Sequence, residues 1–386
     1  MHDRCSGSMM WVAIAAAAVS AVIPVSITRT SAQSSTASST APAAALKTLW
    51  GEPDLQGIWT DETDTPLPRA AKYADQEIFT DAQRAELDVQ RASLGGKDNR
   101  AERGTELDVT GSYNDLFISR KRTGSRTSRI VDPPNGRIPP LTPEAQKIAV
   151  ADREFRLALM QATETCKIKY RTCAGGKYDP TPSPQRAELA PRYNTTARMN
   201  RHDGPEDATL AERCLTGGLP GIGGNSFRRI VQTPSGISMF YDVGQGQGWQ
   251  RNIVMDGSPH LPATIRQWYG DSRGHWEGNT LVVETTNFTD KTNWYGSTAG
   301  LRLVERFTLA DAKTLKYEFT VTDPATWTKP WTMEAPLPRI EPPLYEFACH
   351  EQNYGLINVV KGAQIRAAEG IGLSGRAPDY TAGDGK

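Results

Sequence analysis

Acid–base side chains gather in one stretch, Asp256–Phe288, which reads DGSPHLPATIRQWYGDSRGHWEGNTLVVETTNF. His260 lies between the two prolines of SPHLP, so the backbone around it is restrained. A histidine has an unperturbed pKa of about 6.5, and a nearby carboxylate helps it to transfer protons. His260 and Asp256 are therefore candidate catalytic residues. The alternative is a structural histidine that bonds to a loop carbonyl.

Glu284 is a third candidate, in the alternating segment TLVVETTNF. In a strand, Val282, Glu284 and Phe288 would share one face. If that face lined the inside of a barrel, burial would raise the pKa of Glu284 and suit it to acid–base catalysis. The alternative is that Glu284 faces solvent or pairs with Arg306 on a neighbouring strand.

His350 is the fourth candidate, because a disulfide at Cys349 would hold the adjacent histidine firmly in place. With His260, Glu351 and Asp256, His350 could provide nitrogen and oxygen ligands for a metal. The helical H-E-x-x-H zinc motif is absent, however, since Tyr354 stands where its second histidine would be. The predicted catalytic set is therefore His260, Asp256, Glu284 and His350, with no metal and no organic cofactor.

Residues that could bind a substrate surround this set. Tryptophan faces beside carboxylates and amides are typical of pockets for sugars or polyphenols. The predicted substrate-binding residues are Trp268, Asp271, Trp276, Asn287, Arg306 and Glu351. The alternatives are that the tryptophans pack in the core, and that Asp271–Gly274 and Trp276–Asn279 are two turns of a hairpin.

Short β-like segments separated by Gly, Pro, Asp and Asn follow residue 214 and favour an antiparallel fold. We predict a mainly β structure, a barrel-like or strongly twisted sheet over about 214–341, with an irregular, partly helical layer before it. The expected strands are 55–60, 227–233, 237–243, 251–255, 263–269, 280–286, 302–308, 315–322 and 331–334. Helices are expected over 79–94 and from Thr142 to about 162, each with a threonine as N-cap.

The first residues are typical of a signal peptide: Arg4 precedes the apolar run Met9–Ile27, and small residues follow near Ala32. A membrane anchor is the alternative. We therefore expect a periplasmic or secreted protein, cleaved near Ala32. The predicted parts are a signal peptide (1–33), a disordered linker (34–48), an irregular and helical region (49–210), a β-rich barrel-like domain (211–362) and a flexible tail (363–386).

Four cysteines lie beyond the predicted signal peptide, and an even number in an exported protein favours disulfides. Among the three possible pairings we favour Cys166–Cys173 with Cys214–Cys349. A zinc site is the alternative, but no C-x2-C pair is present. Lysine and arginine number 44, and aspartate and glutamate also number 44, so the charge balance indicates neither nucleic acid nor an anionic membrane as a partner.

Several long motifs occur in order, among them QTPSGISMFYD, MDGSPHLP, WYGDSRGHWEGNTLVVETTNF, VTDPATWTKPW and YEFACHEQNYGL, with RIVDPPNGRIPPLTPE upstream. Over roughly 113–362 the chain resembles a large family of exported bacterial proteins whose members are mostly called hypothetical. The resemblance implies an exported, β-rich protein. It implies no substrate and no catalytic residue.

The sequence is compatible with three functions. The first is an exported enzyme that uses acid–base chemistry for hydrolysis, elimination or isomerisation of a small polar, aromatic or sugar-like molecule. The second is a non-catalytic β-barrel that binds such a ligand. The third is an interaction module of the cell envelope, in which the proline-rich segment 129–143 would dock a partner.

Overall fold

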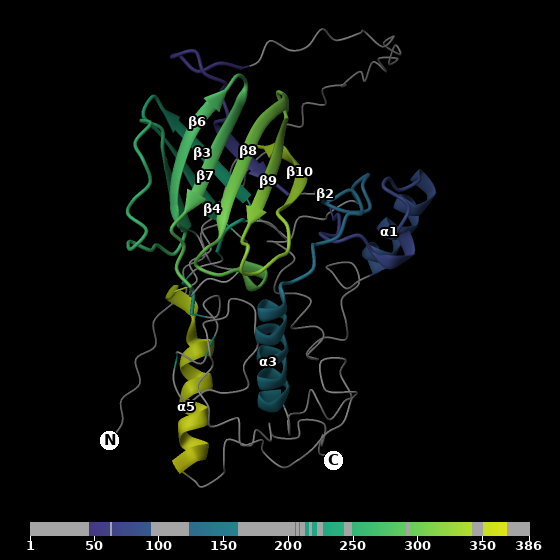
Figure 1. The fold of residues 1–386 in the computed structure, drawn as a ribbon, viewed down its shortest axis with the longest axis vertical. Helices are drawn as coiled ribbons and strands as arrows, with labels where there is room; N and C mark the ends of the chain where they lie inside the picture. Colours follow the sequence, from purple (N-terminus) through teal and green to yellow (C-terminus); the bar gives the residue numbers. More distant parts are fainter. Residues whose placement is uncertain are drawn as a thin grey trace, which may run out of the picture. The chain divides into compact units, whose positions relative to one another are not determined.

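The computed structural model describes residues 46–61, 64–93, 123–160, 205, 208, 213–215, 218–221, 227–242, 249–290, 294–341 and 350–368. These residues all belong to one compact unit, which spans 42–386. The described part is mainly β, as predicted, and most of its strands follow residue 226 (Figure 1). No helix among these residues is long and apolar enough to span a membrane.

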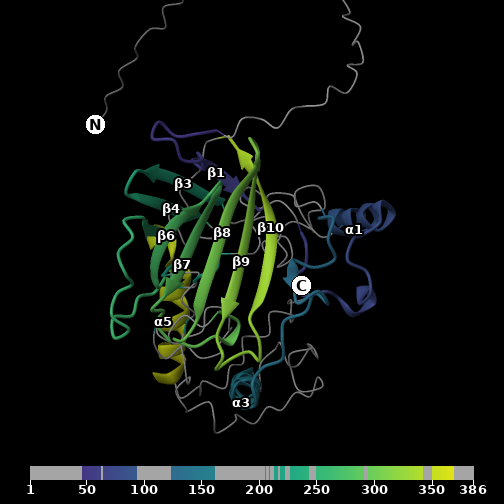
Figure 2. The ribbon, with the colours of Figure 1, turned by 45° about the horizontal axis from the view of Figure 1, so that its top comes forward.

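The strands close into a barrel in the order β1-β3-β4-β5-β6-β7-β8-β9-β10, because β1 pairs with both β3 and β10 (Figure 2). A further short strand, β2, pairs with β10. The bounds are β1 Gly57–Thr60, β2 Ile130–Asp132, β3 Phe227–Thr233, β4 Gly236–Asp242, β5 Trp249–Val254, β6 Asp271–Glu277, β7 Thr280–Thr286, β8 Arg302–Asp311, β9 Thr314–Thr322 and β10 Trp331–Ile340. Closure removes the exposed sheet edges that an open sheet of this size would carry.

The closing strand, β1, comes from the region that we had assigned to the irregular layer. The barrel therefore extends beyond the predicted domain 211–362. Helices α1 (Asp81–Ser93), α3 (Pro143–Met160) and α5 (Tyr354–Ala368) complete the described structure, with 3-10 turns at Ala71–Tyr73, Trp294–Gly296 and His350–Gln352. The helix α5 was not predicted, and it extends into the segment that we expected to be a flexible tail.

Both expected helices begin where the sequence indicates. The amide of Gln83 bonds to Oγ1 of Thr80, and the Gln83 side chain accepts the Thr80 amide, which forms a capping box before α1. The amide of Ala145 bonds in the same way to Oγ1 of Thr142 before α3. Side-chain oxygens thus satisfy backbone donors that a helix leaves without partners in its first turn.

The segment between β5 and β7 differs from the prediction. Asp271–Glu277, expected to begin as a turn, is strand β6, which pairs with β7 over its whole length. The chain turns only at Gly278–Asn279. The expected strand 263–269 is instead a loop, held to Phe288 by one isolated bridge at Gln267. The backbone hydrogen bonds and side-chain contacts that this segment forms with β7 stabilise a strand more than the local preference of Asp-Ser-Arg-Gly stabilises a turn.

Strands β5 and β6 run parallel and share one pairing, Val254 with Arg273. A parallel neighbour needs a crossover connection, and residues 255–270 provide it. Gly270 ends this loop at a φ of +67°, where a Cβ atom would lie 2.5 Å from the Thr286 carbonyl oxygen. Only glycine fits both the backbone and the space, so the loop that contains His260 returns tightly to the start of β6.

Alternate residues of each strand fill the barrel, as the burial of Arg228, Ile230 and Gln232 along β3 shows. The interior is mostly aromatic and aliphatic, with Trp59, Trp331 and Phe307 fully buried. It also contains charged groups, which are described below. Most of the described tryptophans thus pack in the core, which was the alternative to a role in ligand binding. The buried ones are Trp59, Trp249, Trp327 and Trp331.

Candidate functional site

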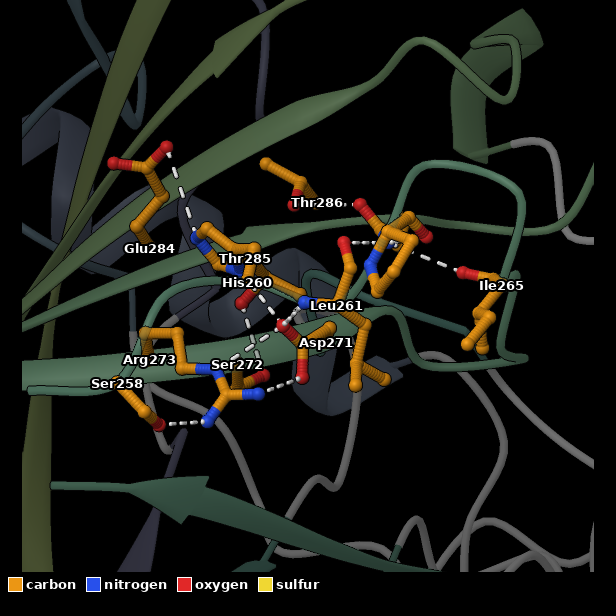
Figure 3. A network of polar contacts seen from close by, with 12 residues as sticks. Ser258, His260, Leu261, Ile265, Asp271, Ser272, Arg273, Glu284, Thr285 and Thr286 are labelled. Atoms are coloured by element: carbon orange, nitrogen blue, oxygen red, sulfur yellow. Dashed lines mark hydrogen bonds and ion pairs between the residues drawn. The ribbon is translucent and has the colours of Figure 1, made fainter. Parts of the chain in front are cut away.

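The crossover loop places His260 over Asp271, the first residue of β6 (Figure 3). Nδ1 of His260 lies 2.8 Å from Oδ2 of Asp271. The imidazole is 26% exposed, whereas the Asp271 side chain is 7% exposed. A buried carboxylate thus orients a partly exposed histidine, which is the arrangement that a general base requires.

Several donors hold Asp271 in its charged form. Its Oδ2 accepts the Leu261 amide at 3.1 Å, and both of its oxygens accept bonds of 3.1 Å from the guanidinium of Arg273. Burial alone would raise the pKa of Asp271, but the bonds from His260, Leu261 and Arg273 lower it overall. An ionised carboxylate only accepts hydrogen bonds, so Nδ1 of His260 carries the hydrogen between them. The neutral imidazole then has its lone pair on Nε2.

Glu284 lies on the other side of the ring, with its Oε1 3.9 Å from Nε2 of His260 (Figure 3). Both of its oxygens accept 2.7 Å bonds from Arg302. These bonds lower the pKa of Glu284, although its partial burial would raise it. The predicted raised pKa is therefore wrong, because Glu284 faces outward, on the opposite side of β7 from the core residues Leu281 and Val283.

Glu284 pairs with Arg302 and not with Arg306, the partner considered from the sequence. The strand register places both arginines within reach of Glu284. Glu284 stands opposite Val304, so the two arginines are its diagonal neighbours on the same face. Arg306 bonds instead to Glu277 at 2.8 Å, which lowers the pKa of Glu277.

Asn287 anchors the loop, and its predicted role in substrate binding stays a prediction. Its Nδ2 donates to the carbonyl oxygens of Leu261, Pro262 and Ile265 at 2.9–3.1 Å. Its backbone has a φ of +60°, which asparagine tolerates better than most residues. We infer that Asn287 positions the backbone next to His260.

Asp256 lies in the same loop but not at the imidazole. It is exposed and accepts the Ser258 amide at 2.8 Å, and hydrogen bonds from Ser258 lower the pKa of Asp256. His350 and Glu351 are both exposed, in the 3-10 turn before α5. Among the described residues no cluster of three or more His, Cys, Asp or Glu side chains could hold a metal.

The two predicted binding tryptophans differ in environment. Trp268, in the crossover loop, is 41% exposed. Trp276, on β6, is partly buried against the core, and its Nε1 is buried without a partner. Of the pair, Trp268 is the one that presents an exposed aromatic surface in the His260 loop.

Cys214 is disulfide-bonded. Cys166, Cys173 and Cys349 lie outside the described residues, so the pairing stays a prediction. Nδ2 of Asn353 lies 3.3 Å from the Cys214 sulfur, which brings the beginning of α5 to Cys214.

Sequence reasoning missed Arg273 and Arg302, the two guanidiniums that keep the carboxylates ionised. It also missed the buried charges inside the barrel, Arg228, Arg251 and Glu305. The available signal was alternation: in Leu303-Val304-Glu305-Arg306-Phe307 the glutamate shares its face with two core residues.

No family model and no curated protein matches the chain. One similar solved structure is the crystal structure of a point mutant of the fluorescent protein UnaG, which is 14% identical and covers 36% of this chain and 90% of that one. Its TM-score is 0.21, so the likeness supports no conclusion about this chain.

Proposed function

We propose that this protein is an exported enzyme that transfers a proton on a small polar molecule, with His260 as the general base. The observation that carries the proposal is the geometry of His260 between Asp271 at 2.8 Å and Glu284 at 3.9 Å. Nε2 accepts the substrate proton, and the two carboxylates stabilise the imidazolium that forms.

The polar contacts of the His260 imidazole favour elimination or isomerisation over the hydrolysis that the sequence also allowed. The described contacts of the imidazole are two carboxylates, and no Ser, Thr or Cys among the described residues bonds to it. Glu284 stays ionised through its bonds to Arg302 and is therefore a poor proton donor near neutral pH. We infer one-base chemistry, in which His260 takes a proton from a carbon atom of the substrate. In an elimination the imidazolium then gives this proton to the departing group, and in an isomerisation it gives it to another atom of the substrate. Trp268 is the exposed aromatic face in the same loop.

A general-base probe tests this proposal. Opening of the ring of 5-nitrobenzisoxazole requires removal of a carbon-bound proton and is followed by absorbance. The wild-type protein should accelerate it over buffer, and His260→Gln should reduce that rate by about a hundredfold, since a positioned base contributes roughly 10²–10⁴.

His275→Gln is the matched control, because His275 is an exposed histidine on β6 that bonds to Glu277 at 3.2 Å. This variant should keep the wild-type rate. Equal rates for wild-type and His260→Gln protein, both folded by circular dichroism, would refute the proposal.

A further inference from the structure

A second polar network lies inside the barrel. Arg228, Arg251 and Glu305 are 1%, 3% and 0% exposed. Arg251 bonds to Glu305 at 2.5 Å and to the Thr285 hydroxyl at 2.7 Å, and the Tyr317 hydroxyl donates to Glu305 at 2.8 Å. The carboxylate is thus engaged by Arg251 and Tyr317, and the three charged groups together leave one excess positive charge.

Arg228 carries that excess. One of its nitrogens, Nη2, donates to the Gly221 carbonyl oxygen, whereas Nε and Nη1 are buried without any hydrogen-bond partner. The guanidinium lies 4.5 Å from the Tyr317 ring centroid and 5.7 Å from that of Tyr241. Cation–π contacts offset only part of the cost of burying unpaired charged donors.

The described interior of the barrel lacks hydrogen-bond acceptors for several of its buried donors. Trp249, Trp276 and Trp331 each have a buried indole N–H without a partner. The buried side-chain oxygens without partners among the described residues are hydroxyls, of Thr60 and Ser297, and none belongs to a carboxylate or amide. The described core is therefore rich in donors and short of acceptors.

Arg228 lies close to one end of the barrel. It is the second residue of β3 and stands opposite Tyr241, which stands opposite Trp249 of β5. One pair further, Phe227 opposite Asp242, the ladder ends. The Tyr241 and Trp249 rings stack at 4.1 Å, so flat apolar surfaces lie in the same layer as the unpaired guanidinium.

We propose that this end layer of the barrel is a binding site for a small organic carboxylate. A carboxylate supplies acceptor oxygens, and its single negative charge matches the single excess positive charge, whereas a phosphate dianion would exceed it. Tyr241 and Trp249 suit an aromatic or aliphatic body. The site is separate from the His260 site, since the two networks occupy opposite faces of the sheet.

Isothermal titration with acetate, benzoate and octanoate, each paired with its uncharged amide, tests this assignment on the wild-type protein. At least one acid should bind at least ten times more tightly than its amide. Arg228→Met should remove that preference, because a hydrogen bond to a charged group is lost. Arg229→Met is the matched control, since Arg229 is the next residue of β3 and is exposed.

Stability provides a second measurement. Without ligand, Arg228→Met should be no less stable to urea than the wild type, because it removes a buried charge that lacks full pairing. If that variant does not fold, Arg228→Lys replaces it and should weaken binding of the same acid at least threefold. Absence of binding by all three acids, or equal binding by wild-type and Arg228 variants, would overturn the proposal.

Discussion

The outer and inner faces of strands β6 and β7 carry two polar networks that differ in how their charges are paired and in how deeply they are buried. Outside, Asp271 and Glu284 each accept bonds from an arginine, and both lie beside His260. Inside, Ser272 and Thr285 bond to Arg251, which shares a single carboxylate with Tyr317. Neighbouring residues in the sequence therefore serve different environments, because successive side chains of a strand point to opposite faces.

The difference is one of pairing and burial. The side chains of the outer ion pair, Glu284 and Arg302, are 34% and 49% exposed, whereas the side chains of the inner pair, Arg251 and Glu305, are 2% and 0% exposed. Burial raises the pKa of Tyr317 well above its usual value, and the nearby Glu305 charge raises it further. On the outer face, water can solvate the exposed parts of the charged groups. In the interior, each polar group without a hydrogen-bond partner lowers the stability of the fold.

Removing the inner carboxylate should have the largest effect. Glu305→Leu leaves Arg251 unpaired beside Arg228, and loss of one partner of a buried pair costs about 3–5 kcal/mol. The free energy of urea unfolding should fall by that amount. The double variant Glu305→Leu/Arg251→Met should recover most of it, and failure to recover would mean that the inner network stabilises the fold by packing alone.

The orienting carboxylate should show an intermediate, pH-dependent effect. The pKa of Asp271 is lower in the folded protein than its ordinary value of 3.8, so it stabilises the fold above 3.8, and this contribution is lost as the pH falls through the lowered value. The stability difference between wild type and Asp271→Asn should therefore shrink from pH 6 to pH 2.5. Parallel stability curves over that range would contradict the burial and bonding described for Asp271.

The outer ion pair should contribute least to stability. Glu284→Gln should lower the unfolding free energy by about 0.2–1 kcal/mol, because partly exposed pairs are screened by water and salt. The loss should be smaller in 1 M NaCl, where the screening length is about 3 Å. A loss as large as that of Glu305→Leu would remove the contrast between the two faces.

Much of the fold was predictable because it rests on local patterns. Short β-like segments between Gly, Pro, Asp and Asn predicted strands at 227–233, 280–286 and 315–322, which the structure has as β3, β7 and β9. Threonine caps predicted the starts of α1 and α3. Strand β6 was missed because Asp-Ser-Arg-Gly favours a turn locally and becomes a strand only through its pairing with β7.

The sites were less predictable, because a site depends on which residues of distant strands meet. His260, Asp271 and Glu284 were all named from the sequence, but their roles relative to one another depend on the crossover loop. Asn287 was named from the sequence as a substrate-binding residue, but its bonds to three carbonyl groups of that loop were not predicted. Arg228 was not predicted as a buried residue, because the sequence does not show which of the two adjacent arginines, Arg228 or Arg229, faces the interior of the barrel.

The sequence by itself determined the β-rich class, most strand positions, the helix caps and the gathering of acid–base groups near His260, because these depend on composition and short-range periodicity. The tertiary structure decided the closure of the barrel by β1, the arginine partner of each carboxylate and the unpaired charge of Arg228. These depend on register and on the face of the strand. A shift of one residue would exchange inside for outside, and no short-range pattern records which register the closed sheet adopts.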